Sequence, residues 1–105
     1  MVHHAPDYLP TIERRLDALD DGRFDLVLYN AGMDPFEGCH VGGLRGIDHE
    51  MLSARERLVF ERVRANGWPI AFVLAGGYAP TEQGRRQLVD LHRETISAAA
   101  AGGSR

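Results

Sequence analysis

The sequence predicts a small α/β fold built on a β-helix-β unit with two parallel strands and flanking helices. Two short, nearly unbroken apolar runs, at residues 24–29 and 70–74, resemble strands that are buried on both faces. A helical pattern separates them, and this order almost always means parallel strands joined by a right-handed crossover. The 105 residues have room for one domain, which we expect over residues 1–101, with a flexible tail at 102–105.

The first expected helix covers residues 7–19, where apolar side chains recur at spacings of three and four residues. These side chains are Leu9, Ile12, Leu16 and Leu19. Asp7 has a side chain suited to a helix N-cap, and Pro10 falls in the first turn, where proline is tolerated. The run Asp20-Asp21-Gly22 predicts the end of this helix.

Two further helices are expected after the first strand. Asp48 can cap the one that connects the strands, which ends near Asn66-Gly67. Its apolar face contains Met51, Leu52, Leu58, Val59 and Val63. Thr81 opens the last helix, whose apolar face contains Leu88, Leu91 and Ile96.

These elements make an incomplete sheet. Strands that are apolar on both faces need two covering layers and further neighbouring strands. One short chain does not supply them, so we expect either another copy of the chain, as in a twofold dimer, or the rest of a longer protein to complete the sheet.

Composition excludes several kinds of partner and location. A formal net charge of −3 leaves no basic excess to neutralise phosphates, so nucleic acid is not expected as a partner. No apolar run approaches the roughly 18 residues of a membrane span, and the first residues do not resemble a signal peptide. The single Cys39 excludes an intramolecular disulfide and favours a reducing compartment. We therefore expect a cytoplasmic protein.

The residues after each strand are the candidates for chemistry. Ligands of open parallel sheets bind outside the carboxyl ends of the strands. The first strand is followed by residues 30–47, a long connection with five glycines, and the second by Ala75-Gly76-Gly77-Tyr78. Paired glycines allow positive φ and close approach of the backbone to a ligand, and they aim one tyrosine hydroxyl at the same edge.

Both stretches resemble one family. Residues 25–34, which read Asp-Leu-Val-Leu-Tyr-Asn-Ala-Gly-Met-Asp, resemble the segment of histone deacetylases in which a strand ends in a small-residue turn and a metal-binding Asp. Residues 73–78, Val-Leu-Ala-Gly-Gly-Tyr, resemble the glycine-rich signature that precedes the catalytic tyrosine. The chain thus resembles the C-terminal part of a zinc-dependent deacetylase of the arginase/histone deacetylase superfamily, which implies part of a three-layer fold.

The resemblance implies a reaction and two residue roles. The family holds zinc with two Asp and one His to activate water and polarise an acetyl-amide carbonyl, in acetyl-lysine, an acetylated polyamine or a related acetyl amide. Asp34 matches one zinc ligand and Tyr78 the hydroxyl that stabilises the oxyanion. The remaining ligands and the tandem His bases normally lie upstream, and His3-His4 lacks their context. We expect the isolated chain to be inactive, with no stably bound zinc.

Simpler interpretations of these residues remain open. Asp34 could form an ordinary Asx-turn before Pro35, and Tyr78 could only pack on the sheet end. A local metal cluster of Asp34, Cys39 and His40 matches no established zinc spacing, so Cys39 and His40 are expected to be plain loop residues.

Other polar residues are expected to have no function in themselves. His49 and His92 should face solvent or the margin of the core. The arginines near positions 14–15, 55–57 and 85–86 should be solubilising. The alternative to a deacetylase fragment is a non-catalytic α/β module that associates with itself or with another subunit.

Overall fold

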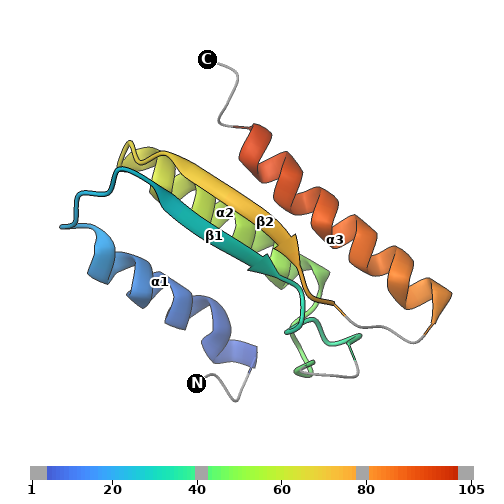
Figure 1. The fold of residues 1–105 in the computed structure, drawn as a ribbon. Coiled ribbons are helices and arrows are strands. Elements are labelled where there is room, and N and C mark those ends of the chain that lie inside the picture. The colour runs from blue at the N-terminus through green and yellow to red at the C-terminus, as the bar shows by residue number, and fades with distance from the viewer. Residues whose placement is uncertain (1–4, 40–42, 78–80, 102–105) are drawn as a thin grey trace.

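The computed structural model describes residues 5–39, 43–77 and 81–101. In these residues a short 3-10 helix, Ala5–Asp7, leads into three α-helices and two strands (Figure 1). In chain order they are α1 (Tyr8–Leu19), β1 (Val27–Gly32), α2 (His49–Ala65), β2 (Ile70–Ala75) and α3 (Glu82–Ala100). The predicted α/β class is confirmed. Tyr78, His40 and the expected tail lie outside the described residues.

The two strands pair in parallel, as predicted for a β-helix-β unit. The register runs from Val27 opposite Ile70 to Gly32 opposite Ala75. The predicted start of β1 at residue 24 is wrong, because the strand begins at Val27, whose N–H donates to the carbonyl oxygen of Pro69 at 2.8 Å. Proline has no N–H with which to extend the ladder further.

The residues just before β1 serve a different contact. The ring of Phe24 packs edge-to-face on Trp68, with 4.9 Å between the ring centroids. Phe24, at the start of the apolar run, therefore packs the segment before β1 against the segment before β2 and does not extend the sheet.

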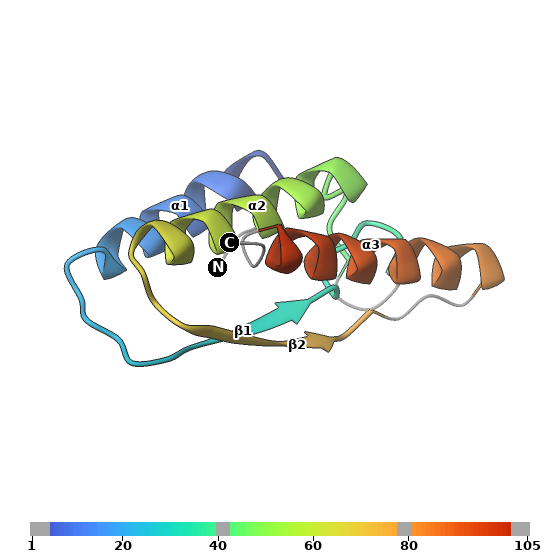
Figure 2. The ribbon, with the colours of Figure 1, turned by 90° about the horizontal axis from the view of Figure 1, so that it is seen from above.

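All three helices lie on one side of the sheet (Figure 2). An aromatic stack joins α2 to this face: the ring of Phe60 meets Tyr29 at 5.7 Å and Phe72 at 5.4 Å between centroids, both edge-to-face. The opposite face is open and presents large apolar side chains, since Leu28 is 76% exposed and Val73 is 59% exposed. The second covering layer that the sequence calls for is not present in the described part of the chain.

Two of the three expected helix caps form. The side chain of Asp48 accepts a hydrogen bond from the N–H of Met51 at 2.9 Å, and that of Thr81 accepts one from Gly84 at 3.0 Å. Asp7 occupies the N-cap of α1 without a side-chain cap, because its backbone is already helical where the 3-10 turn continues into α1. None of the described helices is long and apolar enough to cross a membrane.

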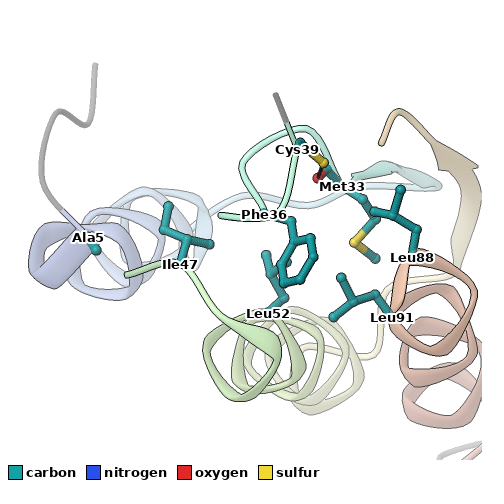
Figure 3. Packing of buried hydrophobic residues seen from close by; sticks show 8 residues of the cluster. All are labelled: Ala5, Met33, Phe36, Cys39, Ile47, Leu52, Leu88 and Leu91. Atoms are coloured by element: carbon teal, nitrogen blue, oxygen red, sulfur yellow. Dashed lines mark hydrogen bonds between the residues drawn. The ribbon is translucent and has the colours of Figure 1, made fainter. Parts of the chain in front are cut away.

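The main apolar cluster lies beneath the loop that follows β1 (Figure 3). Its buried members are Ala5, Met33, Phe36, Cys39, Ile47, Leu52, Leu88 and Leu91. Half of them, from Met33 to Ile47, belong to the loop. They pack against Leu52 of α2 and against Leu88 and Leu91 of α3. The long glycine-containing connection is thus held by its own core side chains.

Candidate functional site

Asp34 and Gly77 meet at the carboxyl edge of the sheet. Each lies two residues beyond the last paired position of its strand, because Gly32 stands opposite Ala75. The N–H of Gly77 donates a hydrogen bond to Oδ1 of Asp34 at 2.7 Å. The two stretches that resemble the deacetylase motifs are therefore in direct contact, with Tyr78 following Gly77 in the chain.

The glycine pair is required by both conformation and space. Gly76 and Gly77 have φ values of +68° and +96°, which side chains of L-residues rarely adopt. A Cβ on Gly76 would lie 2.6 Å from Oδ1 of Asp34, and one on Gly77 would lie 2.9 Å from a methyl carbon of Leu88. The backbone just after β2 can approach the carboxylate this closely because Gly76 has no side chain, and it can pass Leu88 because Gly77 has none.

The carboxylate of Asp34 does not form the Asx-turn that was the simpler interpretation. The N–H of Phe36, which an Asx-turn would use, donates to the carbonyl oxygen of Met33 at 3.1 Å. The side chain reaches across to the neighbouring strand instead. Asp34 is exposed, and within residues 5–39, 43–77 and 81–101 its carboxylate has one hydrogen-bond donor, the N–H of Gly77 on Oδ1.

Cys39 is a loop residue, as expected, but it points into the core. Its side chain is 5% exposed, and its Sγ lies 3.4 Å from the carbonyl oxygen of Met33, to which it donates. Among the described residues, no group of three or more His, Cys, Asp or Glu side chains is arranged to hold a metal ion. His40 lies outside this part of the chain, so the structure does not test the cluster of Asp34, Cys39 and His40.

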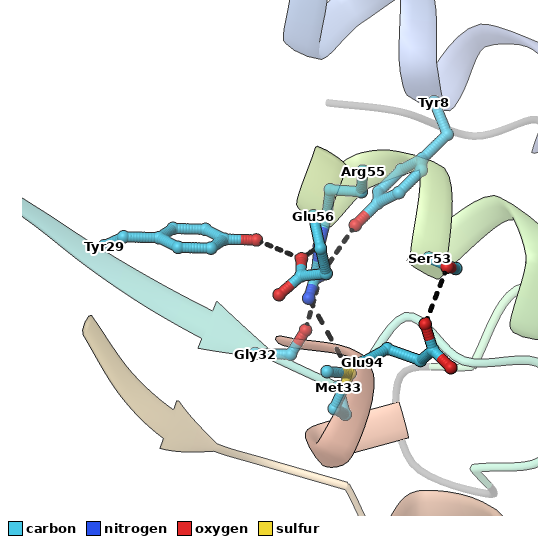
Figure 4. A network of polar contacts seen from close by, with 8 residues as sticks. All are labelled: Tyr8, Tyr29, Gly32, Met33, Ser53, Arg55, Glu56 and Glu94. Carbon is cyan, nitrogen blue, oxygen red and sulfur yellow. Dashed lines mark hydrogen bonds and ion pairs between the residues drawn. The ribbon is translucent and has the colours of Figure 1, made fainter. Parts of the chain in front are cut away.

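A buried polar network lies behind this edge, and the sequence did not predict it (Figure 4). Arg55 is 5% exposed and Glu56 is 1% exposed, so the interpretation of Arg55 as a solubilising residue is wrong. Arg55 Nε donates to Glu56 Oε1 at 2.6 Å, and the hydroxyl of Tyr29 donates to the same oxygen at 2.5 Å. Arg55 Nη1 donates to the hydroxyl oxygen of Tyr8 at 3.0 Å and to the carbonyl oxygen of Gly32 at 2.6 Å.

The network changes the pKa of the Tyr29 phenol. Burial raises the pKa of the Tyr29 phenol well above its ordinary value, the charge of Arg55 opposes this, and the hydrogen bond to Glu56 adds to it. Tyr29 therefore remains a neutral donor at alkaline pH, where an exposed tyrosine would lose its proton. One sequence signal could have identified the network: Arg55 and Glu56 interrupt a helical stripe of buried residues formed by Leu52, Val59 and Val63.

A separate surface cleft of about 680 Å³ lies between the start of α2 and the neighbouring helices. In it His49 Nε2 lies 3.6 Å from Glu94 Oε1, and Ser53 donates to Glu94 Oε2 at 3.0 Å. His49 is exposed, as the sequence predicted. These contacts tie α2 to α3, and neither Asp34 nor Gly77 lines the cleft.

No family model matches the chain. The chain is 41% identical over 79 residues to an uncharacterized protein of Picosynechococcus sp. (strain ATCC 27264 / PCC 7002 / PR-6). The match takes in 75% of this chain and 23% of that protein. The chain therefore spans less than a quarter of this curated relative.

Proposed function

We propose that this chain is the C-terminal section of a zinc-dependent deacetylase domain of the arginase/histone deacetylase superfamily. Its complete form hydrolyses acetyl-lysine, an acetylated polyamine or a related acetyl amide. The observation that carries the proposal is the hydrogen bond between Gly77 and Asp34. It joins the stretch that resembles the zinc-binding segment to the stretch that resembles the tyrosine signature, at the edge where ligands of parallel sheets bind.

Asp34 can be one of the ligands of a zinc site, but it cannot form the site alone. A catalytic zinc needs about three protein ligands and an open position. Asp34 offers one exposed carboxylate, in which Oδ1 accepts from Gly77 and Oδ2 would be the oxygen that binds the metal. The other ligands would come from the rest of the domain. When bound, zinc supplies a Lewis acid that activates water and polarises the acetyl carbonyl.

Tyr78 would be the donor to the oxyanion, a role worth about 3–4 kcal/mol in sites of this kind. The glycine pair just before it supports this assignment, because positive φ at both residues turns the chain at the point of contact with Asp34. Tyr78 follows that turn directly in the sequence.

The open sheet face supports a larger domain. Leu28 and Val73 expose apolar side chains on the face that no described helix covers, and each strand has an edge that no described strand pairs. The relative is more than four times as long as the stretch it shares with this chain, since that stretch is 23% of it. The remainder of such a longer chain would supply the second helical layer of a three-layer fold and the upstream zinc ligands.

The same open face also favours the alternative, a non-catalytic α/β module that associates with itself or with another subunit. Zinc separates the two functions, because only the deacetylase requires the carboxylate of Asp34 to be a ligand. A module that only associates would tolerate its replacement.

The test uses the complete domain that contains this sequence. Its zinc content and its hydrolysis of an acetyl-lysine peptide and an acetylated polyamine are measured, together with the variants Asp34→Asn and Tyr78→Phe. We expect Asp34→Asn to lose zinc and activity, and Tyr78→Phe to lower kcat by about 10² or more with little change in KM. Asp90→Asn is the control, because Asp90 is an exposed carboxylate on α3. A folded, zinc-free and inactive domain would favour the non-catalytic module.

A further inference from the structure

We infer that Arg55 is a positioning residue for Asp34: from inside the domain, its guanidinium holds the last carbonyl of β1 and so sets where the Asp34 carboxylate stands at the sheet edge. The inference rests on the proposed function only for the use that zinc would make of that position. The position itself depends on contacts within this chain.

Arg55 binds the chain immediately before Asp34. Its Nη1 donates to the carbonyl oxygen of Gly32 at 2.6 Å, and its Nη2 lies 3.7 Å from Sδ of Met33. On the other side, the N–H of Met33 donates to the carbonyl oxygen of Ala75 at 3.0 Å. The backbone of the two residues before Asp34 is thus held from α2 and from β2, and this sets where the chain carries Asp34 relative to Gly77.

The guanidinium is itself held in one orientation. Tyr8 of α1 accepts from Nη1, while Glu56 accepts from Nε and also from the hydroxyl of Tyr29. These bonds come from α1, α2 and β1, so a displacement of Arg55 would disturb all three elements. The planar fork of an arginine can bond a carboxylate and a backbone carbonyl at the same time, which a lysine ammonium does less well.

Packing alone does not explain why a charged pair, Arg55 and Glu56, is buried here. Replacing a buried ion pair by apolar residues of similar volume is often neutral or stabilising. A charged pair that is almost fully buried, at 5% and 1% exposure, therefore points to a need for hydrogen bonds that an apolar residue cannot make. One of them is the bond from Arg55 to the backbone of Gly32. That bond ends two residues from Asp34.

The amide of Gly77 provides the readout, because its N–H donates to the carboxylate. In the 105-residue chain, NMR measures its hydrogen exchange and the dependence of its chemical shift on the ionisation of Asp34. The main variant replaces the network by apolar groups: Arg55→Met, Glu56→Leu and Tyr29→Phe together. Arg57→Met is the matched control, since Arg57 is exposed on the same helix and donates only to Ser53 among the described residues.

We expect the triple variant to speed exchange at Gly77 by about tenfold or more and to weaken the pH dependence of its shift, while Arg57→Met changes neither. If the triple variant does not fold, Arg55→Lys takes its place. It keeps a charge beside Glu56, loses the fork, and should show a smaller change in the same direction. A Gly77 amide that behaves as in the original chain in a folded variant would overturn the inference.

The complete domain gives the second readout. Loss of a direct contact to a metal ligand typically lowers metal affinity by about 10–100-fold. The network acts on Asp34 indirectly, through Gly32 and Met33, so the triple variant should bind zinc more weakly by up to about tenfold and Arg57→Met should not. If the unmodified domain binds no zinc, the proposed function fails while the Gly77 measurement still decides the positioning. If the domain binds zinc and the variant binds it equally well, Arg55 does not position Asp34 for the metal.

Discussion

At the scale of single residues, the stability of this chain depends on keeping two buried charges paired. Arg55 and Glu56 meet at 2.6 Å with almost no access to water. Removing one partner of a buried pair typically costs about 3–5 kcal/mol, because the remaining charge stays buried without compensation. The hydroxyl of Tyr29 adds a neutral donor to the same carboxylate, and this donor makes the network sensitive to high pH.

We predict that the free energy of unfolding falls at alkaline pH through Tyr29. Burial raises the pKa of this phenol above the ordinary 10.0. Its contribution is complete below about pH 10 and is lost as the pH rises further, because the unfolded chain releases the proton that the folded chain keeps. The slope contributed by this one group is at most about 1.4 kcal/mol per pH unit.

Urea denaturation of the chain and of Tyr29→Phe across this pH range measures the effect. Tyr8 and Tyr78 are present in both proteins, so a difference in how steeply the free energy of unfolding falls with pH is due to Tyr29. Equal slopes would mean that Tyr29 ionises as readily in the folded chain as in the unfolded one.

At the scale of elements, the helix starts depend on single side chains. We predict that Thr81→Ala lowers the free energy of unfolding by about 1 kcal/mol, because the N–H of Gly84 loses its acceptor at the start of α3. Thr81→Ser keeps a hydroxyl at the cap and should be nearly neutral. Urea denaturation of the two variants gives the comparison, and an equal loss in both would assign the effect to packing of the threonine methyl instead.

The elements also show what the sequence can predict. Asp48 and Thr81 identify their helices because an N-cap acts within three residues of itself, so the signal is local. The start of β1 does not follow from the local pattern, because Phe24 contacts Trp68, a residue from a distant part of the chain.

The same distinction applies to the candidate site. Asp34 and Gly77 are expected to lie close together because the carboxyl ends of parallel strands meet at one edge of the sheet. The burial of Arg55 depends on Gly32 and Tyr8, which no local pattern pairs with it. The roles of Asp34 and Tyr78 in metal binding and catalysis remain predictions.

At the scale of the whole molecule, we predict that the isolated chain retains no stoichiometric zinc and does not hydrolyse acetyl-lysine substrates. A single carboxylate at the sheet edge does not complete an open site of about three ligands. Elemental analysis after gel filtration and a deacetylase assay measure both properties. Tightly bound zinc, with turnover abolished by Asp34→Ala, would mean that residues of this chain complete the site by themselves.

The open sheet face leads to the last prediction, that the isolated chain folds as a homo-oligomer, a twofold dimer. Leu28 and Val73 project from the face that the helices leave uncovered, and the adjoining strand edges carry unpaired backbone groups. A twofold arrangement covers the face with a second copy of itself, and a stable interface would bury more than about 1,000 Å² in total.

Light scattering measures the mass against the 11.6 kDa of one chain. We expect Leu28→Arg to shift the chain toward monomer, because a charge on that face opposes its burial. Val89→Arg should not do so, since Val89 is 53% exposed on α3. A cooperatively melting monomer across a wide range of concentrations would contradict the dimer. One helical layer would then be sufficient to stabilise this sheet, and the exposure of Leu28 and Val73 would be tolerated in water.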